Sequence, residues 1–115
     1  MRSVLAMLAV HVGLAGCGSG ADVTREVGAR CDTAAECDDR CLPPSAQAPG
    51  GFCSTTCADA GDCPGDTTCV DRDAGICLFT CFADADCRFL GEGWGCRELR
   101  RAEDPTRPVK ACLGS

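Results

Sequence analysis

The sequence lacks tyrosine and asparagine, and it has one histidine, one lysine and one tryptophan among its 115 residues. The histidine, His11, lies in an apolar run near the N-terminus, so removal of that run would leave no imidazole for Ser–His or Cys–His catalysis. Large apolar residues are also scarce, at 15 of the 99 residues from Cys17 onward. Such a low content of large apolar residues normally indicates disorder, because these residues bury too little surface to offset the conformational entropy of the chain.

Thirteen cysteines reverse that expectation. Such a density in a short exported chain is typical of a disulfide scaffold, which stabilises domains too small for a sufficient core. We therefore expect a small disulfide-rich fold with little regular structure and short β-hairpins, formed in an oxidising compartment.

Charge is distributed unevenly. From Cys17 onward, ten basic and seventeen acidic residues give a net charge of −7. Residues 31–96 hold three arginines against twelve acidic residues, whereas residues 97–110 hold five basic and three acidic ones. Because an acidic body repels phosphate backbones, nucleic acid is excluded as an expected partner.

The N-terminus has the pattern of an export signal. Met1-Arg2 is a short positive segment, and Val4–Leu14 is apolar but shorter than the roughly 20 residues of a membrane-spanning helix. The following Leu14-Ala15-Gly16-Cys17 resembles the lipobox of bacterial lipoproteins. An ordinary signal peptide cleaved after Ala15 is the alternative.

The lipobox resemblance implies that signal peptide 1–16 is removed and that Cys17 receives diacylglycerol and further acylation. Two or three acyl chains would hold the protein stably on a membrane. Gly18, in place of the Asp that retains such proteins in the inner membrane, implies an outer-membrane location in the cell envelope. Residues 17–30 are then the lipidated N-terminus and a flexible tether, followed by a disulfide-rich domain at 31–115.

The domain contains an internal repeat. Without Cys17 the cysteine count is even, at twelve, and these cysteines form three units of four, at 31–53, 57–77 and 81–112. In each unit the first gap is five residues long and an acidic residue precedes the second cysteine. The units contain Cys31, Cys37, Cys41 and Cys53; Cys57, Cys63, Cys69 and Cys77; and Cys81, Cys87, Cys96 and Cys112.

The sequence pattern predicts similar local structure in the three units. The first gap favours a turn or one helical turn, and the third and fourth cysteines lie in β-prone segments around a polar loop. In the second unit, 67–70 and 76–78 flank a loop at 71–75 that ends in glycine. Pro43–Gly51 is the loop of the first unit, and residues 98–103 are expected to form a short helix in the third.

Disulfide connectivity does not follow from spacing, and nested pairing or pairing between units stays open. The spacing of the first unit resembles the start of colipase and Dickkopf-type cysteine-rich folds. That resemblance implies first-to-third and second-to-fourth pairing in each unit: Cys31–Cys41, Cys37–Cys53, Cys57–Cys69, Cys63–Cys77, Cys81–Cys96 and Cys87–Cys112. The whole pattern also resembles cysteine-rich-repeat lipoproteins of GC-rich, soil-dwelling Gram-negative bacteria, which implies topology and location but no activity.

We expect neither a catalytic site, nor a metal site, nor a cofactor. The chain has no C-x-x-C or C-x-C pair of the kind that binds zinc, and no cleft is expected that would set two carboxylate pKa values apart. Weak calcium binding by acidic loops is the open alternative. The carboxylates concerned are Asp59, Asp62, Asp66, Asp71, Asp73, Asp84 and Asp86.

The expected role is that of an interaction or structural module at the cell surface, with a protein or glycan partner and the membrane bound through Cys17. A protease inhibitor presenting a constrained loop is the alternative, with loops Pro43–Gly51 and Arg97–Lys110 as candidates and Arg100, Arg101 or Arg107 as the residue a trypsin-like protease would accept. Four aromatic residues cluster near the third unit, and packing over disulfides is preferred to a partner-binding patch as their role. They are Phe79, Phe82, Phe89 and Trp94, while Phe52 stands apart.

Overall fold

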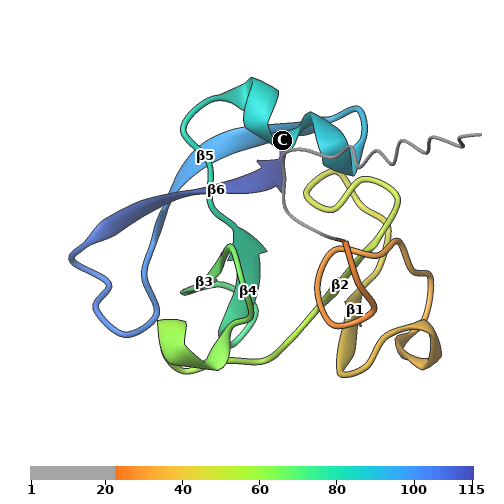
Figure 1. Ribbon diagram of the computed structural model, residues 1–115, viewed down its shortest axis with the longest axis horizontal. Coiled ribbons are helices and arrows are strands. Elements are labelled where there is room, and N and C mark those ends of the chain that lie inside the picture. Colours follow the sequence, from red (N-terminus) through yellow and green to blue (C-terminus); the bar gives the residue numbers. More distant parts are fainter. Residues whose placement is uncertain (1–22) are drawn as a thin grey trace, which may run out of the picture.

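The computed structural model describes residues 23–115 and consists of three similar units, each with a 3₁₀ helix followed by a two-stranded antiparallel hairpin (Figure 1). The elements are η1 (Ala34–Glu36), β1 (Arg40–Leu42) and β2 (Phe52–Ser54); η2 (Ala60–Asp62), β3 (Thr67–Val70) and β4 (Ile76–Phe79); and η3 (Asp84–Leu90), β5 (Trp94–Arg100) and β6 (Pro108–Gly114). The expected small disulfide-rich fold with short hairpins is confirmed.

Cysteines occupy equivalent positions in the three hairpins. The third and fourth cysteine of each unit lie directly opposite one another, as Cys41 and Cys53 do across β1 and β2. Each bonds to a cysteine that flanks the 3₁₀ helix or, for Cys112, to Cys87 within it, instead of to its cross-strand neighbour. Two disulfides per unit therefore clamp the helical turn onto the hairpin.

The third hairpin is longer than expected, and the helix expected at 98–103 is wrong. Residues through Arg100 belong to β5, with Glu98 opposite Lys110 and Leu99 opposite Val109. An isolated helix of six residues is marginal, because nucleation costs more than so few hydrogen bonds return. Here β6 offers the same residues a continuous ladder instead, and Pro105 lies in the connection between the strands.

One apolar core joins the units. Phe52, expected to stand apart, is fully buried and packs against Phe79 of the second unit and Trp94 of the third, with ring centroids 6.2 and 5.2 Å away. Phe79 in turn contacts Phe89, at 5.1 Å. The fold brings Phe52 to the other aromatic rings although it is distant from them in the chain, so the expectation for Phe52 was wrong. The three units therefore pack against one another.

Polar contacts reinforce this junction. Ser54 of β2 is fully buried, and its hydroxyl donates to the carbonyl of Cys77 in β4, at 2.9 Å, while accepting from the N–H of the same residue, at 3.0 Å. A buried hydroxyl left without such partners would be costly. These two hydrogen bonds fix the position of the first hairpin relative to the second.

The second half of the expected tether packs against the first unit. Val27 is 2% exposed, the N–H of Gly28 donates to the carbonyl of Cys53, and the N–H of Cys53 donates to the carbonyl of Ala29, both at 2.8 Å. These bonds extend the pairing of β2, and burial of Val27 favours them. The tether expectation therefore does not hold for residues 24–30.

Candidate functional site

All twelve cysteines after Cys17 form disulfides, with Cα–Cα distances between 5.3 and 6.0 Å. The six pairs coincide with those implied by the colipase and Dickkopf resemblance: Cys31–Cys41, Cys37–Cys53, Cys57–Cys69, Cys63–Cys77, Cys81–Cys96 and Cys87–Cys112. Three groups of cysteine sulfurs lie within 4.8 Å of one another, but all are in disulfides. In this oxidised form these cysteines offer a metal no thiolate.

The acidic residue before each second cysteine closes the 3₁₀ turn. Glu36 accepts hydrogen bonds from the N–H groups of Asp32 and Thr33, at 2.6 and 3.2 Å. Asp62 and Asp86 accept the equivalent pairs in the second and third units, at 2.8–3.2 Å. These bonds to backbone N–H groups, the first residue of each turn foremost, lower the pKa of all three carboxyls.

These carboxylates predict an acid-dependent stability. A folded-state pKa below the unfolded value stabilises the fold above about pH 4, and the contribution is lost as the pH falls through the folded pKa. We expect the triple variant Glu36→Gln, Asp62→Asn, Asp86→Asn to unfold at lower urea than wild type at neutral pH and to lose less of its midpoint on acidification. Urea titrations at pH about 7 and about 2.5 measure both. An acid-induced loss as large as that of wild type would assign the effect to other groups, such as Asp104, whose pKa is lowered chiefly by the Thr106 hydroxyl.

The loop carboxylates expected to offer calcium ligands are partly engaged by the backbone. Besides Asp62 and Asp86, Asp59 accepts from the N–H of Gly61 and Asp84 from that of Cys96, both at 2.8 Å. Within residues 23–115, no three carboxylates converge as a metal site would require. Asp66, Asp71 and Asp73 lie exposed on the second unit.

The first candidate inhibitory loop, Pro43–Gly51, contacts the third unit through its later residues. Ala48 is 3% exposed, Trp94 Nε1 donates to the carbonyl of Pro49 at 3.2 Å, and the N–H of Gly114 donates to the carbonyl of Gln47 at 2.8 Å. Residues 43–47 are exposed, but the contacts of Gln47 and Pro49 fix the loop to the third unit.

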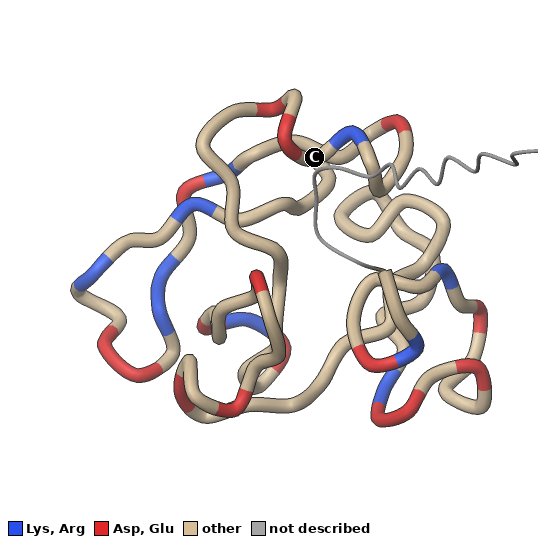
Figure 2. The backbone as a smooth tube through the Cα atoms, viewed as in Figure 1, with Lys and Arg blue, Asp and Glu red and all other residues tan. Residues whose placement is uncertain are grey.

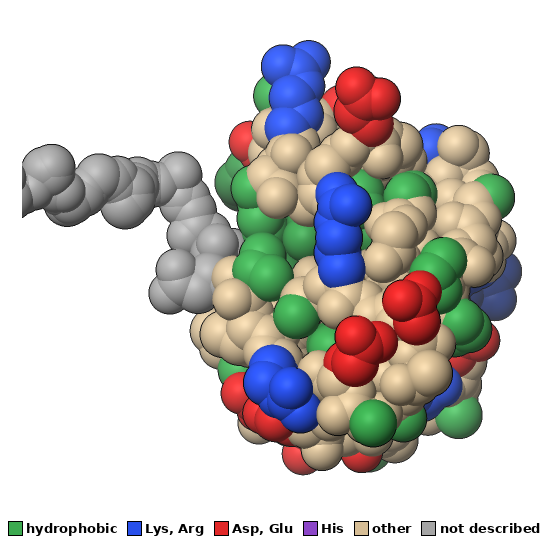
Figure 3. All heavy atoms as spheres, turned by 90° about the vertical axis from the view of Figure 1, so that its right-hand side faces the viewer, with side chains coloured by type: hydrophobic (Ala, Val, Ile, Leu, Met, Phe, Trp, Pro, Cys, Tyr) green, Lys and Arg blue, Asp and Glu red, His purple; other side chains and the backbone are tan. Residues whose placement is uncertain are grey.

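The second candidate, Arg97–Lys110, is the β5–β6 hairpin, and it holds the densest group of cations. Figure 2 shows them along the hairpin on the left, apart from most of the acidic residues of the other units. In the described part of the chain, the ion pair present is Arg25 with Asp38, at 3.5 Å, and it leaves the hairpin cations unpaired. They are Arg97, Arg100, Arg101, Arg107 and Lys110. By contrast, basic and acidic side chains are mixed on the face shown in Figure 3.

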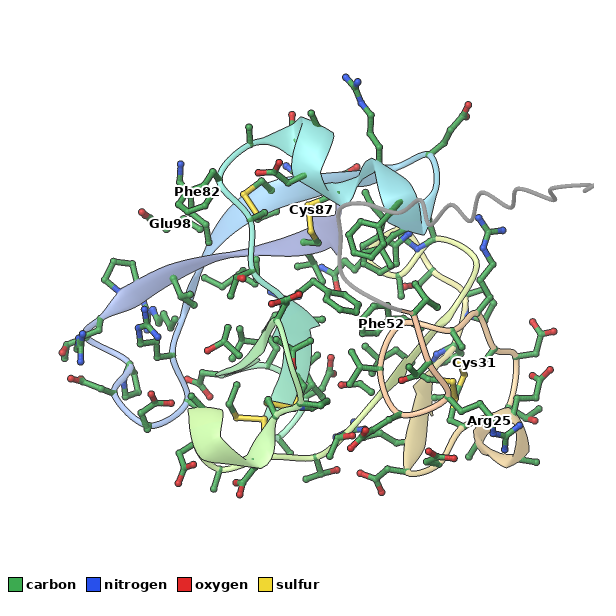
Figure 4. The ribbon with its side chains drawn as sticks, viewed as in Figure 1. Arg25, Cys31, Phe52, Phe82, Cys87 and Glu98 are labelled. Carbon is green, nitrogen blue, oxygen red and sulfur yellow. A yellow bond between two sulfur atoms is a disulfide. The ribbon has the colours of Figure 1, made fainter. Side chains whose placement is uncertain are left out.

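A hollow of about 320 Å³ lies beside this hairpin. Its lining combines an aromatic ring with two cations: Thr80, Cys81, Phe82, Arg101, Pro108, Val109 and Lys110. Phe82 is 89% exposed, and Nε of Arg101 is buried without a hydrogen-bond partner. In Figure 4, Phe82 lies at the outer side of the hairpin, near Glu98.

Sequence reasoning placed Phe82 in the aromatic cluster and Lys110 at a loop end, and so missed their proximity. The internal repeat could have singled out Phe82. It follows the first cysteine of its unit, where the other two units have Asp32 and Ala58. We call the lining of this hollow the Phe82 groove.

Signal peptide 1–16 and the lipidation residue Cys17 lie outside the described residues. Within residues 23–115, no helix has both the length and the apolar character needed to cross a membrane. Comparisons of the chain with protein-family models, curated proteins and solved structures return no match.

Proposed function

We propose that the protein is a lipid-anchored interaction module of a bacterial cell envelope, in the outer membrane. The main support for the proposal is the number of cysteines and how they are paired. Six disulfides use all twelve cysteines of the three units, so Cys17 has no partner among them, and it stands at the fourth position of a lipobox-like motif.

The described surface supports binding over catalysis. The cysteines of the three units form disulfides, and no histidine lies after residue 17. Among residues 23–115, no three carboxylates converge. Nucleophilic and general acid–base catalysis need such groups within hydrogen-bonding reach of one another. A rigid scaffold with an exposed aromatic ring beside unpaired cations is instead suited to recognition of a protein or glycan.

The mass of the protein extracted from membranes tests the anchor. We expect a chain that begins at Cys17 with added acyl groups, and a gain of 12 hydrogens on reduction because each of the six disulfides takes up two. The variant Cys17→Ser should leave the membrane fraction while keeping the same gain on reduction. A mature chain that starts elsewhere and carries no lipid would overturn the proposal.

Inhibition of a protease is less well supported by the same geometry. Pro43–Gly51 is tied to the third unit through Gln47 and Pro49, and half of Arg97–Lys110 is already paired in a β-ladder, which leaves less extended backbone for a protease to bind. We expect no inhibition of trypsin by the intact oxidised protein. A stoichiometric loss of trypsin activity with the chain left uncut would favour the inhibitor.

A further inference from the structure

We infer that the Phe82 groove binds an acidic peptide segment that carries an apolar side chain next to its carboxylates. This inference deepens the proposed function by naming the chemistry of the partner. It rests on that proposal only in treating the domain as a binding module, because the groove lies wholly within the described residues.

The internal repeat shows that the scaffold does not require Phe82. Its backbone N–H donates to Asp86, as those of Asp32 and Ala58 donate to the capping carboxylates of their own units. The same backbone hydrogen bond therefore forms with a charged side chain or a methyl group at this position. The ring is 89% exposed and so contributes little to the core. Leaving an aromatic side chain in water is less favourable than burying it against a partner.

Lys110 departs from the repeat in the same way. Two residues before the fourth cysteine, the first two units have Gly51 and Gly75, and the third has Lys110. The carbonyl groups of Gly75 and Lys110 accept the same bond from the first cysteine of their units, at 3.1 and 3.2 Å. The backbone role is thus retained while a cation is added beside Phe82.

The charges of the groove select an anion. Arg101 and Lys110 both line it, and Nε of Arg101 is buried with its hydrogen-bonding capacity unused. A carboxylate would satisfy an arginine with charge-assisted hydrogen bonds. Elsewhere, residues 31–96 hold twelve acidic residues against three arginines, so an anionic partner would be repelled from most other surfaces.

Apolar groups in the same hollow exclude a simple inorganic anion as the best ligand. Phe82, Pro108 and Val109 form an apolar wall that phosphate or sulfate would leave uncovered. Alternating acidic and aliphatic side chains in a peptide place both chemistries a few ångströms apart. Glu98 lies opposite Lys110 across the ladder, where its carboxylate would compete with such a ligand for the lysine.

Calorimetric titration of the full lipidated protein in neutral detergent tests the inference. The probe is the acetylated, amidated peptide Leu-Glu-Leu-Glu, and its neutral counterpart is Leu-Gln-Leu-Gln. We expect the acidic peptide to bind at least about tenfold more tightly than the neutral one. Phe82→Ala and Lys110→Gln should each weaken binding by about tenfold.

Two further variants make the result specific. Glu98→Gln should strengthen binding by about threefold, because it removes the competing carboxylate. Arg97→Gln removes an exposed cation of the same hairpin that does not line the groove, and it should change affinity little. Cys17→Ser should bind as wild type does, so failure of the lipid anchor and failure of the groove are distinguishable.

Equal affinity for the two peptides, or wild-type affinity in Phe82→Ala, would overturn the inference. So would Phe82-dependent binding to phosphatidylglycerol vesicles without binding of the acidic peptide, which would assign the groove to a lipid surface. Unchanged affinity in Glu98→Gln would contradict the placement of the ligand at Lys110.

Discussion

Replacing Phe52 by alanine is expected to destabilise the oxidised protein by about 3–5 kcal/mol, the range for truncating a fully buried phenylalanine. The side chain is 0% exposed and contacts aromatic rings of both other units. Its removal would leave a cavity at the point where the three units meet. Urea unfolding with the disulfides intact, followed by Trp94 fluorescence, measures the loss because Trp94 lies beside the cavity.

Phe82→Ala is the matched control. It makes the same chemical change at a ring that is 89% exposed, and we expect a shift within about 0.5 kcal/mol. If Phe52→Ala cost no more than Phe82→Ala, the shared core would not stabilise the protein, and each unit would be held by its own disulfides.

Removal of the disulfide Cys87–Cys112 is expected to have the other large effect. The bond closes a separation of 25 residues, and the chain-entropy model assigns it about 3.5 kcal/mol. Both cysteines also belong to the main core, at 0% and 1% exposure, so alanine at both positions would lose packing in addition. The comparison variant removes Cys31–Cys41, which closes only 10 residues and is assigned about 2.7 kcal/mol.

The two double-alanine variants should therefore differ in the same direction as their loop lengths and burial. Urea midpoints of the purified variants, with the remaining five disulfides verified by mass, provide the test. A larger loss from removing Cys31–Cys41 would contradict the model, since that pair belongs to the small separate cluster of the first unit.

The repeat made much of the local structure predictable. The five-residue first gap and the β-prone segments around the later cysteines led directly to the helical turns and to the hairpin of β3 and β4. These are short-range features, and the residues that specify them lie close together in the chain. The disulfide pairs came from resemblance and not from spacing, because four cysteines allow three pairings whatever their gaps.

The failures of prediction share a long-range origin. Residues 98–103 were expected to be helical, whereas 98–100 pair with 108–110 in a hairpin. Local propensity does not reveal those partners, because they lie beyond a turn. Phe52 was separated from the other aromatic residues for the same reason, since Phe79 and Trp94 are far from it in the chain.

The sequence by itself determined the class of the protein: an acidic, cysteine-stabilised chain in three units, preceded by a motif that predicts lipidation at Cys17. Composition and spacing suffice for this, because the disulfide requirement follows from the scarcity of large apolar residues. Tertiary structure decided that the three units share one core, that Pro43–Gly51 is tied to the third unit, and that Phe82 lines one groove with Arg101 and Lys110. Those relations depend on packing between segments distant in the chain, which no local pattern records.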